Sequence, residues 1–157
     1  MYAIRLLVMG KISKGPQGEL TAEYLKRLRP YAKMEIKEGK EETFRSVDEK
    51  ARVLKEEAGR IEKMLVQDAY TIVLSVEGKG MASEDFAKAL EEWSEHGARQ
   101  IQFVIGGPLG LADSIKQRAN LLLSLSPLTF PHDLARVLLL EQLYRGITIQ
   151  KGKTYHY

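Results

Sequence analysis

Two loops in the last third of the chain carry the residues that could take part in chemistry. One apolar run ends in a glycine-rich loop at residues 106–110, and another ends in a loop rich in serine and proline at residues 124–131. In an α/β sheet, ligands bind at the carboxyl ends of the strands, where such loops lie. The second loop leads directly into a helix start, whose free backbone N–H groups can bind a polar or anionic group. The two loops together predict a ligand pocket.

The glycine-rich loop does not match the common phosphate-binding motifs. Its spacing differs from the G-x-G-x-x-G dinucleotide fingerprint, and no Gly-Lys-Ser/Thr follows as in a P-loop. By itself, it is as typical of a tight strand-to-helix turn as of a binding site. Ser124 and Ser126 are candidate nucleophiles, but the nucleophile-elbow pattern is absent around them. Hydroxyl groups at a strand end commonly bond to nearby backbone groups instead.

His132 and Arg136 are four residues apart at the start of the last expected helix, so they share one face. They are either a helix cap and a surface charge, or a basic pair at the mouth of the pocket. Because they follow the second loop directly, we expect them to point toward a ligand and away from the core. Glu141 and Arg145 have the same spacing near the end of the helix. For Arg145, a surface ion pair and a ligand contact both remain open.

Composition excludes several classes of chemistry. The 157 residues carry a net charge of +3 and contain no cysteine, which rules out disulfides, thiolate metal sites and cysteine nucleophiles. The histidines at positions 96, 132 and 156 lack metal-ligand spacing, so no metal is expected. The isoelectric point near 9.0 permits a nucleic-acid partner without requiring one. The apolar run 2–9 is too short for a membrane span and carries no signal-peptide pattern, so the expected compartment is the cytoplasm.

Short apolar runs alternate along the chain with segments of helical periodicity. The clearest helix follows the capping-box pair Ser46 and Glu49. The expected elements are strand 2–9, helix 18–29, strand 32–37, helix 47–66, strand 70–76, helix 83–97, strand 101–105, helix 111–120, strand 121–125 and helix 132–146. This order predicts an α/β fold, with a mostly parallel sheet and helices on both faces, in a single domain over residues 1–157.

Several details of these helices can be checked. Ser83 is expected to cap the helix that would end at Gly97. The last helix is apolar on nearly all sides, which in so short a chain suggests that one face meets the sheet and another a second subunit. We therefore expect a homodimer. The apolar stripe of the second helix is expected at Ala51, Leu54, Ala58, Ile61 and Leu65.

Positive charge is concentrated in the N-terminal fifth of the chain, where Lys26 and Arg27 lie close to Tyr24 and Tyr31. Such a cluster is commonly a solvated face. It is also suited to contact the phosphates of an RNA.

The sequence resembles the ribosomal RNA large subunit methyltransferase H family over its whole length. The most specific similarities are the runs 103–111, 123–132 and 136–145 and the tail residues Tyr155 and His156. Segments 10–11, 24–28, 57–59 and 77–79 are similar too. Two positions depart from the family pattern, because Gly146 stands where the family more often has alanine and Tyr157 stands where a basic residue often follows.

The resemblance implies a SPOUT-class α/β fold with a C-terminal trefoil knot and a homodimeric enzyme. It implies transfer of a methyl group from S-adenosylmethionine to N3 of a pseudouridine in 23S ribosomal RNA, on the assembled ribosome. His132 is then a candidate base for the N3 proton, and Arg136 could instead lower the pKa of the target by proximity.

The resemblance also implies two sets of contact residues. An apolar slot for adenine, together with glycines that let the backbone approach, suits an adenosyl ligand. The RNA contacts are expected at Lys26, Arg27, Arg145, Tyr155 and His156. The cofactor contacts are expected at Leu74, Gly106, Gly107, Leu125, Ser126, Pro127, Leu128, Thr129, Phe130 and Pro131.

Two other functions compete with this one. A non-catalytic protein that binds RNA or the ribosome could use the same basic face. A nucleotide-using enzyme of flavodoxin-like or Rossmann type fits less well, because no phosphate loop follows the first strand and no acidic residue occupies a ribose-reading position.

Overall fold

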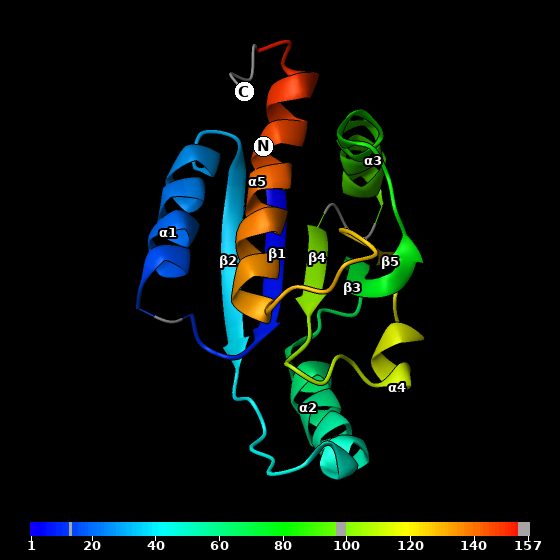
Figure 1. Ribbon diagram of the computed structural model, residues 1–157. Helices are drawn as coiled ribbons and strands as arrows, with labels where there is room; N and C mark the ends of the chain where they lie inside the picture. The colour runs from blue at the N-terminus through cyan, green and yellow to red at the C-terminus, as the bar shows by residue number, and fades with distance from the viewer. Residues whose placement is uncertain (13, 97–99, 154–157) are drawn as a thin grey trace.

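The computed structural model describes residues 1–12, 14–96 and 100–153. These residues form a five-stranded sheet in which each pair of neighbouring strands is parallel (Figure 1). The strands lie in the order β2-β1-β4-β3-β5. Their bounds are Tyr2–Met9 for β1, Ala32–Gly39 for β2, Tyr70–Lys79 for β3, Gln100–Ile105 for β4 and Leu121–Leu123 for β5.

Helices cover both faces of this sheet. The helices α1 (Pro16–Leu28), α5 (His132–Gln150) and α3 (Ser83–Glu95) lie side by side over one face (Figure 1). The opposite face is covered by α2 (Lys50–Met64) and the short α4 (Asp113–Lys116).

The central strand β1 shows why both faces must be covered. Leu6 and Val8 belong to the core under α1, α3 and α5, whereas Leu7 and Met9 belong to the core under α2 and α4. Successive side chains of a strand point to opposite faces, so a continuous apolar run needs cover on both sides. The predicted α/β fold with a mostly parallel sheet and helices on both faces is confirmed.

The buried face of α2 differs from the predicted stripe. A 3₁₀ turn at Val47–Glu49 precedes the helix, and the side chain of Ser46 accepts a hydrogen bond from the Asp48 N–H. Ala51 is exposed and Leu54 is only half-buried. The buried residues are Val53, Glu57, Ala58 and Ile61. The prediction is confirmed for Ala58 and Ile61 and was wrong for Ala51 and Leu54, because the buried face is turned toward Val53 and Glu57.

Several predicted boundaries also change. The helix predicted at 111–120 is only the four-residue α4, and β5 has three residues. Strand β3 continues to Lys79, through what was expected to be a turn, because Lys79 pairs with Leu123 after an irregularity. A Cβ at Gly78 would lie 2.6 Å from the carbonyl carbon of Leu122, so glycine allows this close approach. Ser83 does not cap α3, because its hydroxyl donates to Gln142; Gly97 lies outside the described residues.

Helix α5 is four residues longer than expected and lies between α1 and α3. Leu139, Leu140, Leu143 and Ile147 are fully buried within one chain. Part of its apolar character therefore reflects neighbours in the same chain, whereas Leu134, Leu138 and Tyr144 are only half-buried, and the homodimer stays a prediction. No described helix is long and apolar enough to cross a membrane.

Candidate active site

The two predicted loops meet at the carboxyl edge of the sheet. The loop after β4 and the loop before α5 line a common cavity of about 610 Å³. Gly107 and Pro108 come from the first loop, and Thr129 and Phe130 from the second. Lys50 and other residues of α2 close the far side. Strands β4 and β5 lie on either side of β3 and run parallel to it, so the loops after them lie at the same edge of the sheet, where open α/β sheets bind ligands.

A smaller cavity of about 100 Å³ lies next to the first and shares Phe130 with it. Leu74, near the middle of β3, faces Leu125, Ser126 and Leu128 across this space. Leu128 is 72% exposed, so a large apolar side chain lies uncovered beside the cavity. The structure thus gathers seven of the ten predicted cofactor residues around the two cavities. The other three, Gly106, Pro127 and Pro131, line neither of them.

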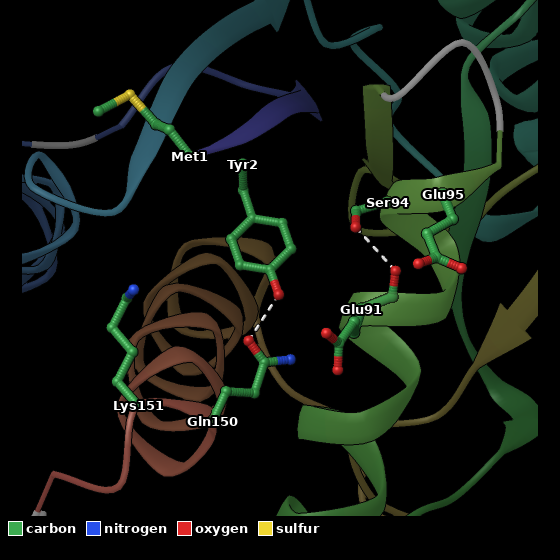
Figure 2. A pocket seen from close by; sticks show the side chains of 7 residues that line it. All are labelled: Met1, Tyr2, Glu91, Ser94, Glu95, Gln150 and Lys151. Atoms are coloured by element: carbon green, nitrogen blue, oxygen red, sulfur yellow. Dashed lines mark hydrogen bonds between the residues drawn. The ribbon is translucent and has the colours of Figure 1, made fainter.

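A larger cavity, of about 760 Å³, lies at the opposite edge of the sheet (Figure 2). It is lined by the start of β1 and the ends of α3 and α5, and the Tyr2 hydroxyl donates to Gln150 across it. Ligands of α/β sheets bind at the carboxyl ends of the strands, and this cavity is at the amino ends. Its size therefore does not make it the better candidate.

Hydrogen bonds within the second loop account for its serines. The Ser124 hydroxyl donates to the Ser126 carbonyl oxygen at 3.0 Å, and the Ser126 hydroxyl accepts from the Leu128 N–H at 3.0 Å. Both hydroxyls therefore shape the loop, as expected for serines at a strand end, and neither contacts a histidine through these bonds.

Two of the three glycines of the first loop leave space that other groups occupy. A Cβ at Gly106 would lie 2.6 Å from the carbonyl oxygen of Gly110, on the other side of the tight turn. A Cβ at Gly107 would lie 3.0 Å from Oε2 of Glu57. The absence of a side chain at Gly107 thus makes room for a buried glutamate of α2.

Glu57 is the functional candidate that sequence reasoning missed. Glu57 is 2% exposed, and its Oε1 atom accepts a hydrogen bond from the Glu42 N–H at 3.0 Å. Oε2 has no hydrogen-bond partner among the described residues. Burial raises the pKa of the Glu57 carboxyl, and the nearby Glu41 adds to that rise. The sequence does contain a sign of its burial, because Glu57 lies four residues after Val53 and four before Ile61, on the same face of the helix.

Replacing Glu57 with glutamine is expected to stabilise the protein by about 1 kcal/mol at pH 8, because no buried carboxylate must then ionise. The raised pKa means that the stability contributed by the protonated carboxyl is present below the unfolded-state pKa and is lost as pH rises through the folded-state pKa. The gain should therefore shrink toward pH 4. Thermal unfolding from pH 4 to 8 measures it.

The matched control is Glu62→Gln on the exposed side of α2, where the carboxylate lies 3.7 Å from Arg118. It should change the unfolding temperature little at any pH. A gain for Glu57→Gln that is equal at pH 4 and pH 8 would contradict the expected protonation.

His132 lies at the carboxyl edge of the sheet, beside the end of β1. Its Nε2 atom is 3.1 Å from Oε1 of Glu41 and 3.4 Å from Oδ1 of Asp133. The side chain is 18% exposed, so it is partly accessible. It lines neither of the two cavities at this edge but directly follows the loop that does.

Arg136 does not point away from the core, and that expectation was wrong. Its side chain is 1% exposed, and Nη1 donates to Oε1 of Glu38 at 2.6 Å. Nη2 donates to the carbonyl oxygen of Gly10 at 3.1 Å. Burial raises the pKa of Glu38, but hydrogen bonds from Arg136 and the Ile12 N–H outweigh it and hold the pKa below its usual value. A shared helix face with His132 could not indicate this, because the partners lie on β1 and β2.

Comparison with known proteins identifies the family. The sequence model described as "Predicted SPOUT methyltransferase" matches residues 2–156. The chain belongs to the SPOUT methyltransferases. It is 45% identical over 156 residues to ribosomal RNA large subunit methyltransferase H of Caldicellulosiruptor saccharolyticus, covering 98% of this chain and 99% of that protein. The proteins of the same name from Streptococcus equi subsp. zooepidemicus and Enterococcus faecalis are 44% and 42% identical, with 98% of each chain covered.

These relatives confirm the resemblance that the sequence motifs indicate, because they match along the whole chain at well above 30% identity. A solved structure of a putative methyltransferase from Legionella pneumophila, with the bound cofactor SAM, has a TM-score of 0.47 and 16% identity. It covers 93% of this chain and 66% of that chain.

The described residues that are expected to contact RNA do not line the cavities at the carboxyl edge of this SPOUT protein. Lys26 and Arg27 are exposed at the end of α1, and Arg27 lies over the rings of Tyr24 and Tyr144. Arg145 is paired with Glu141 at 2.9 Å. Helix α5 runs from the carboxyl edge of the sheet to the amino edge, so these side chains lie toward its far end. Tyr155 and His156 lie outside the described residues. Among the described residues, no group of three or more histidine or acidic side chains could hold a metal ion.

Proposed function

We propose that this SPOUT protein transfers a methyl group from S-adenosylmethionine to N3 of a pseudouridine in 23S ribosomal RNA, on the assembled ribosome. The observation that carries the proposal is the meeting of the two predicted loops in one cavity at the carboxyl edge of the sheet, beside a smaller cavity that Leu74 lines together with the second loop. The full-length relatives are named as large-subunit ribosomal RNA methyltransferases, which supports the choice of substrate.

The residues present fit the cofactor. Leu74, Leu125 and Leu128 enclose an apolar slot that suits an adenine ring, and the adjoining cavity of about 610 Å³ has the size of ordinary small-molecule sites. Backbone groups of the loop 126–131 would bind the polar edge of the base. When bound, S-adenosylmethionine supplies a methyl group activated by its positively charged sulfur.

The protein itself contributes position and proton acceptance. Methyl transfer depends strongly on alignment of the attacking atom with the methyl group, and rigid loops at a sheet edge provide that alignment. The N3 proton must leave the base. His132 follows the cofactor loop and is partly exposed, so we assign it as the proton acceptor. Arg136 is fully occupied by Glu38 and Gly10, and its role at the site would act through the position of α5.

A homodimer would bring a second set of RNA contacts to the site. In one chain, Lys26, Arg27 and Arg145 lie toward the amino edge of the sheet, while the cavities lie at the carboxyl edge. A partner copy would place its basic residues, together with Tyr155 and His156 of its tail, beside the cofactor. The family resemblance supports this arrangement, the trefoil knot, a single domain and a cytoplasmic location, where ribosomes are found.

The proposal is tested by replacing Leu128 with aspartate. Leu128 is exposed in the free protein, so the variant should fold, yet it loses an apolar contact to adenine and its affinity for S-adenosylmethionine should fall about tenfold or more. Isothermal titration measures binding. Tritium transfer to ribosomes from a strain lacking this activity should fall in parallel at low cofactor concentration.

The matched control is Val47→Asp, at another exposed apolar side chain (68%) that lines neither cavity at the carboxyl edge. It should bind the cofactor like the unmodified protein. Ribosome binding without methyl transfer by the unmodified protein would favour the non-catalytic alternative and overturn the proposal.

A further inference from the structure

Three segments that are far apart in the sequence meet around one glycine. Gly10 ends β1, Glu41 follows β2 and His132 begins α5. Gly10 has φ +98°, a conformation that side chains other than glycine rarely adopt. A Cβ at Gly10 would lie 2.9 Å from Nε2 of His132 and would also clash with Oε1 of Glu41. The contact between Glu41 and His132 therefore occupies the space that a side chain at Gly10 would need.

The contact places a ring nitrogen beside a buried oxygen of Glu41. The Oε1 atom has no hydrogen-bond partner among the described residues, and the imidazole Nε2 of His132 lies 3.1 Å from it. Burying a carboxylate oxygen without a donor is costly. The distance is suitable for a hydrogen bond while the alignment is not complete, as is common at catalytic sites before a ligand binds.

This geometry determines which imidazole nitrogen is available for chemistry. A neutral imidazole carries its proton on one nitrogen and accepts with the other. A proton on Nε2 would lie on the side of Glu41 and would leave Nδ1 as the acceptor. Asp133, 3.4 Å from Nε2, lies on the same side of the ring.

We propose that Glu41 is a positioning residue that holds His132 in the Nε2–H form, so that Nδ1 accepts the proton from N3 of the target base. This inference rests on the proposed function. The N3–H bond breaks, and its proton goes to Nδ1. The N3 electron pair forms the bond to the methyl carbon, and the pair of the carbon–sulfur bond returns to the sulfur, which leaves as a neutral thioether. The resulting imidazolium faces Glu41 and Asp133.

The test is Glu41→Gln, which keeps the shape but can turn an N–H toward Nε2 and so favour the opposite tautomer. We expect kcat for methyl transfer to ribosomes to fall roughly tenfold or more, because the wrong tautomer cannot accept the proton. KM for ribosomes and the affinity for S-adenosylmethionine should not change. Changed binding with unchanged kcat would overturn the proposal.

Glu42→Gln is the control for a merely structural role. Glu42 lies in the same segment, but its carboxylate pairs with Arg52 at 3.0 Å and with Arg60, and these are its ion pairs among the described residues. If loosening the segment were enough to lower kcat, Glu42→Gln would do so as well, and the proposal would fail. The double variant Glu41→Gln with His132→Ala should be no slower than His132→Ala alone, because Glu41 acts through His132. Additive losses would also contradict it.

A second measurement does not depend on methyl transfer. Nitrogen-15 NMR of the histidine rings reports the tautomer, and the spectrum of His132→Ala assigns His132 among the three histidines. When the His132 ring is neutral, the Nε2–H tautomer should dominate in the unmodified protein. In Glu41→Gln, the tautomer population should shift toward Nδ1–H. If His132 is mainly Nδ1–H in the unmodified protein, the inference is wrong even if the protein is a methyltransferase. If the tautomer is as expected but no methyl is transferred, the proposed function fails instead.

Discussion

Glu38→Ala is expected to lower the free energy of unfolding by about 3 kcal/mol, because it removes the partner of a buried arginine. Arg136 is 1% exposed, and Glu38 is its acidic contact at 2.6 Å. Its Nε atom has no hydrogen-bond partner in the part of the chain that the structure describes. The guanidinium would be left with the Gly10 carbonyl oxygen alone. Urea unfolding followed by the fluorescence of the buried Trp93 measures the change.

The control for this variant is Glu23→Ala, which removes an exposed ion pair to Arg27 of similar length, 2.8 Å. It should change the free energy of unfolding far less than Glu38→Ala does, because an exposed ion pair is screened by solvent. The pKa of Glu38 is held low in the folded protein, so its stabilising contribution is present above the unfolded-state pKa and is lost as pH falls through the folded-state pKa. The difference in the free energy of unfolding between the unmodified protein and Glu38→Ala should therefore become smaller at acid pH. If Glu38→Ala and Glu23→Ala lowered the free energy of unfolding equally, the buried pair would have no special structural role.

This result has a bearing on Arg136 itself. Arg136→Ala should also lower methyl transfer, but a loss caused by unfolding or by displacement of α5 would not assign the arginine to catalysis. Activity of that variant has meaning only after its folded fraction has been measured.

His132→Ala is expected to lower methyl transfer about a hundredfold, within the range typical of removing a general base. The affinity for S-adenosylmethionine should stay the same, because His132 lines neither cavity that would hold the cofactor. Single-turnover tritium transfer to ribosomes, with saturating enzyme, separates this effect from binding.

His96→Ala provides the comparison. His96 is exposed at the end of α3, where its Nδ1 lies 2.7 Å from the Glu92 carbonyl oxygen, next to Glu95 of the cavity at the amino edge. It should retain full activity. Transfer by His132→Ala at the unmodified rate would remove His132 from the mechanism and would leave the proton acceptor to be sought elsewhere, with Glu57 as the next buried carboxyl.

The parts of the site that could be predicted were those governed by strand order. A parallel sheet places the ends of its strands at one edge, so the convergence of the loops after β4 and β5 followed from periodicity and turn residues, whereas Leu74 was expected from the family resemblance. The assignment of those residues to one cofactor came from the family resemblance and is still a prediction. Element types were predicted well because apolar runs and helical stripes were long.

The errors arose where a side chain depends on a distant partner. Periodicity places Arg136 and His132 on one face of a helix, but only the packed structure shows that Glu38 and Glu41 lie opposite them. An apolar pattern cannot show that Glu57 is buried beside Gly107, because a glutamate normally marks the exposed face. The number of neighbours that α5 has within the chain is also a tertiary property, and the homodimer expected from its apolar sides stays a prediction.

The two anchors of α5 on β1 have a consequence for synthesis of the chain. Arg136 bonds to Gly10 near one end of the helix, and Gln150 accepts from Tyr2 near the other. At ordinary translation rates, residues 2–10 leave the ribosome on the order of ten seconds before residues 136–150. During that interval the apolar side of β1 that α5 will cover has no permanent partner, and it is a natural place for a chaperone to bind. The cofactor loop, which connects β5 to α5, can become rigid only after the newest part of the chain docks on the oldest.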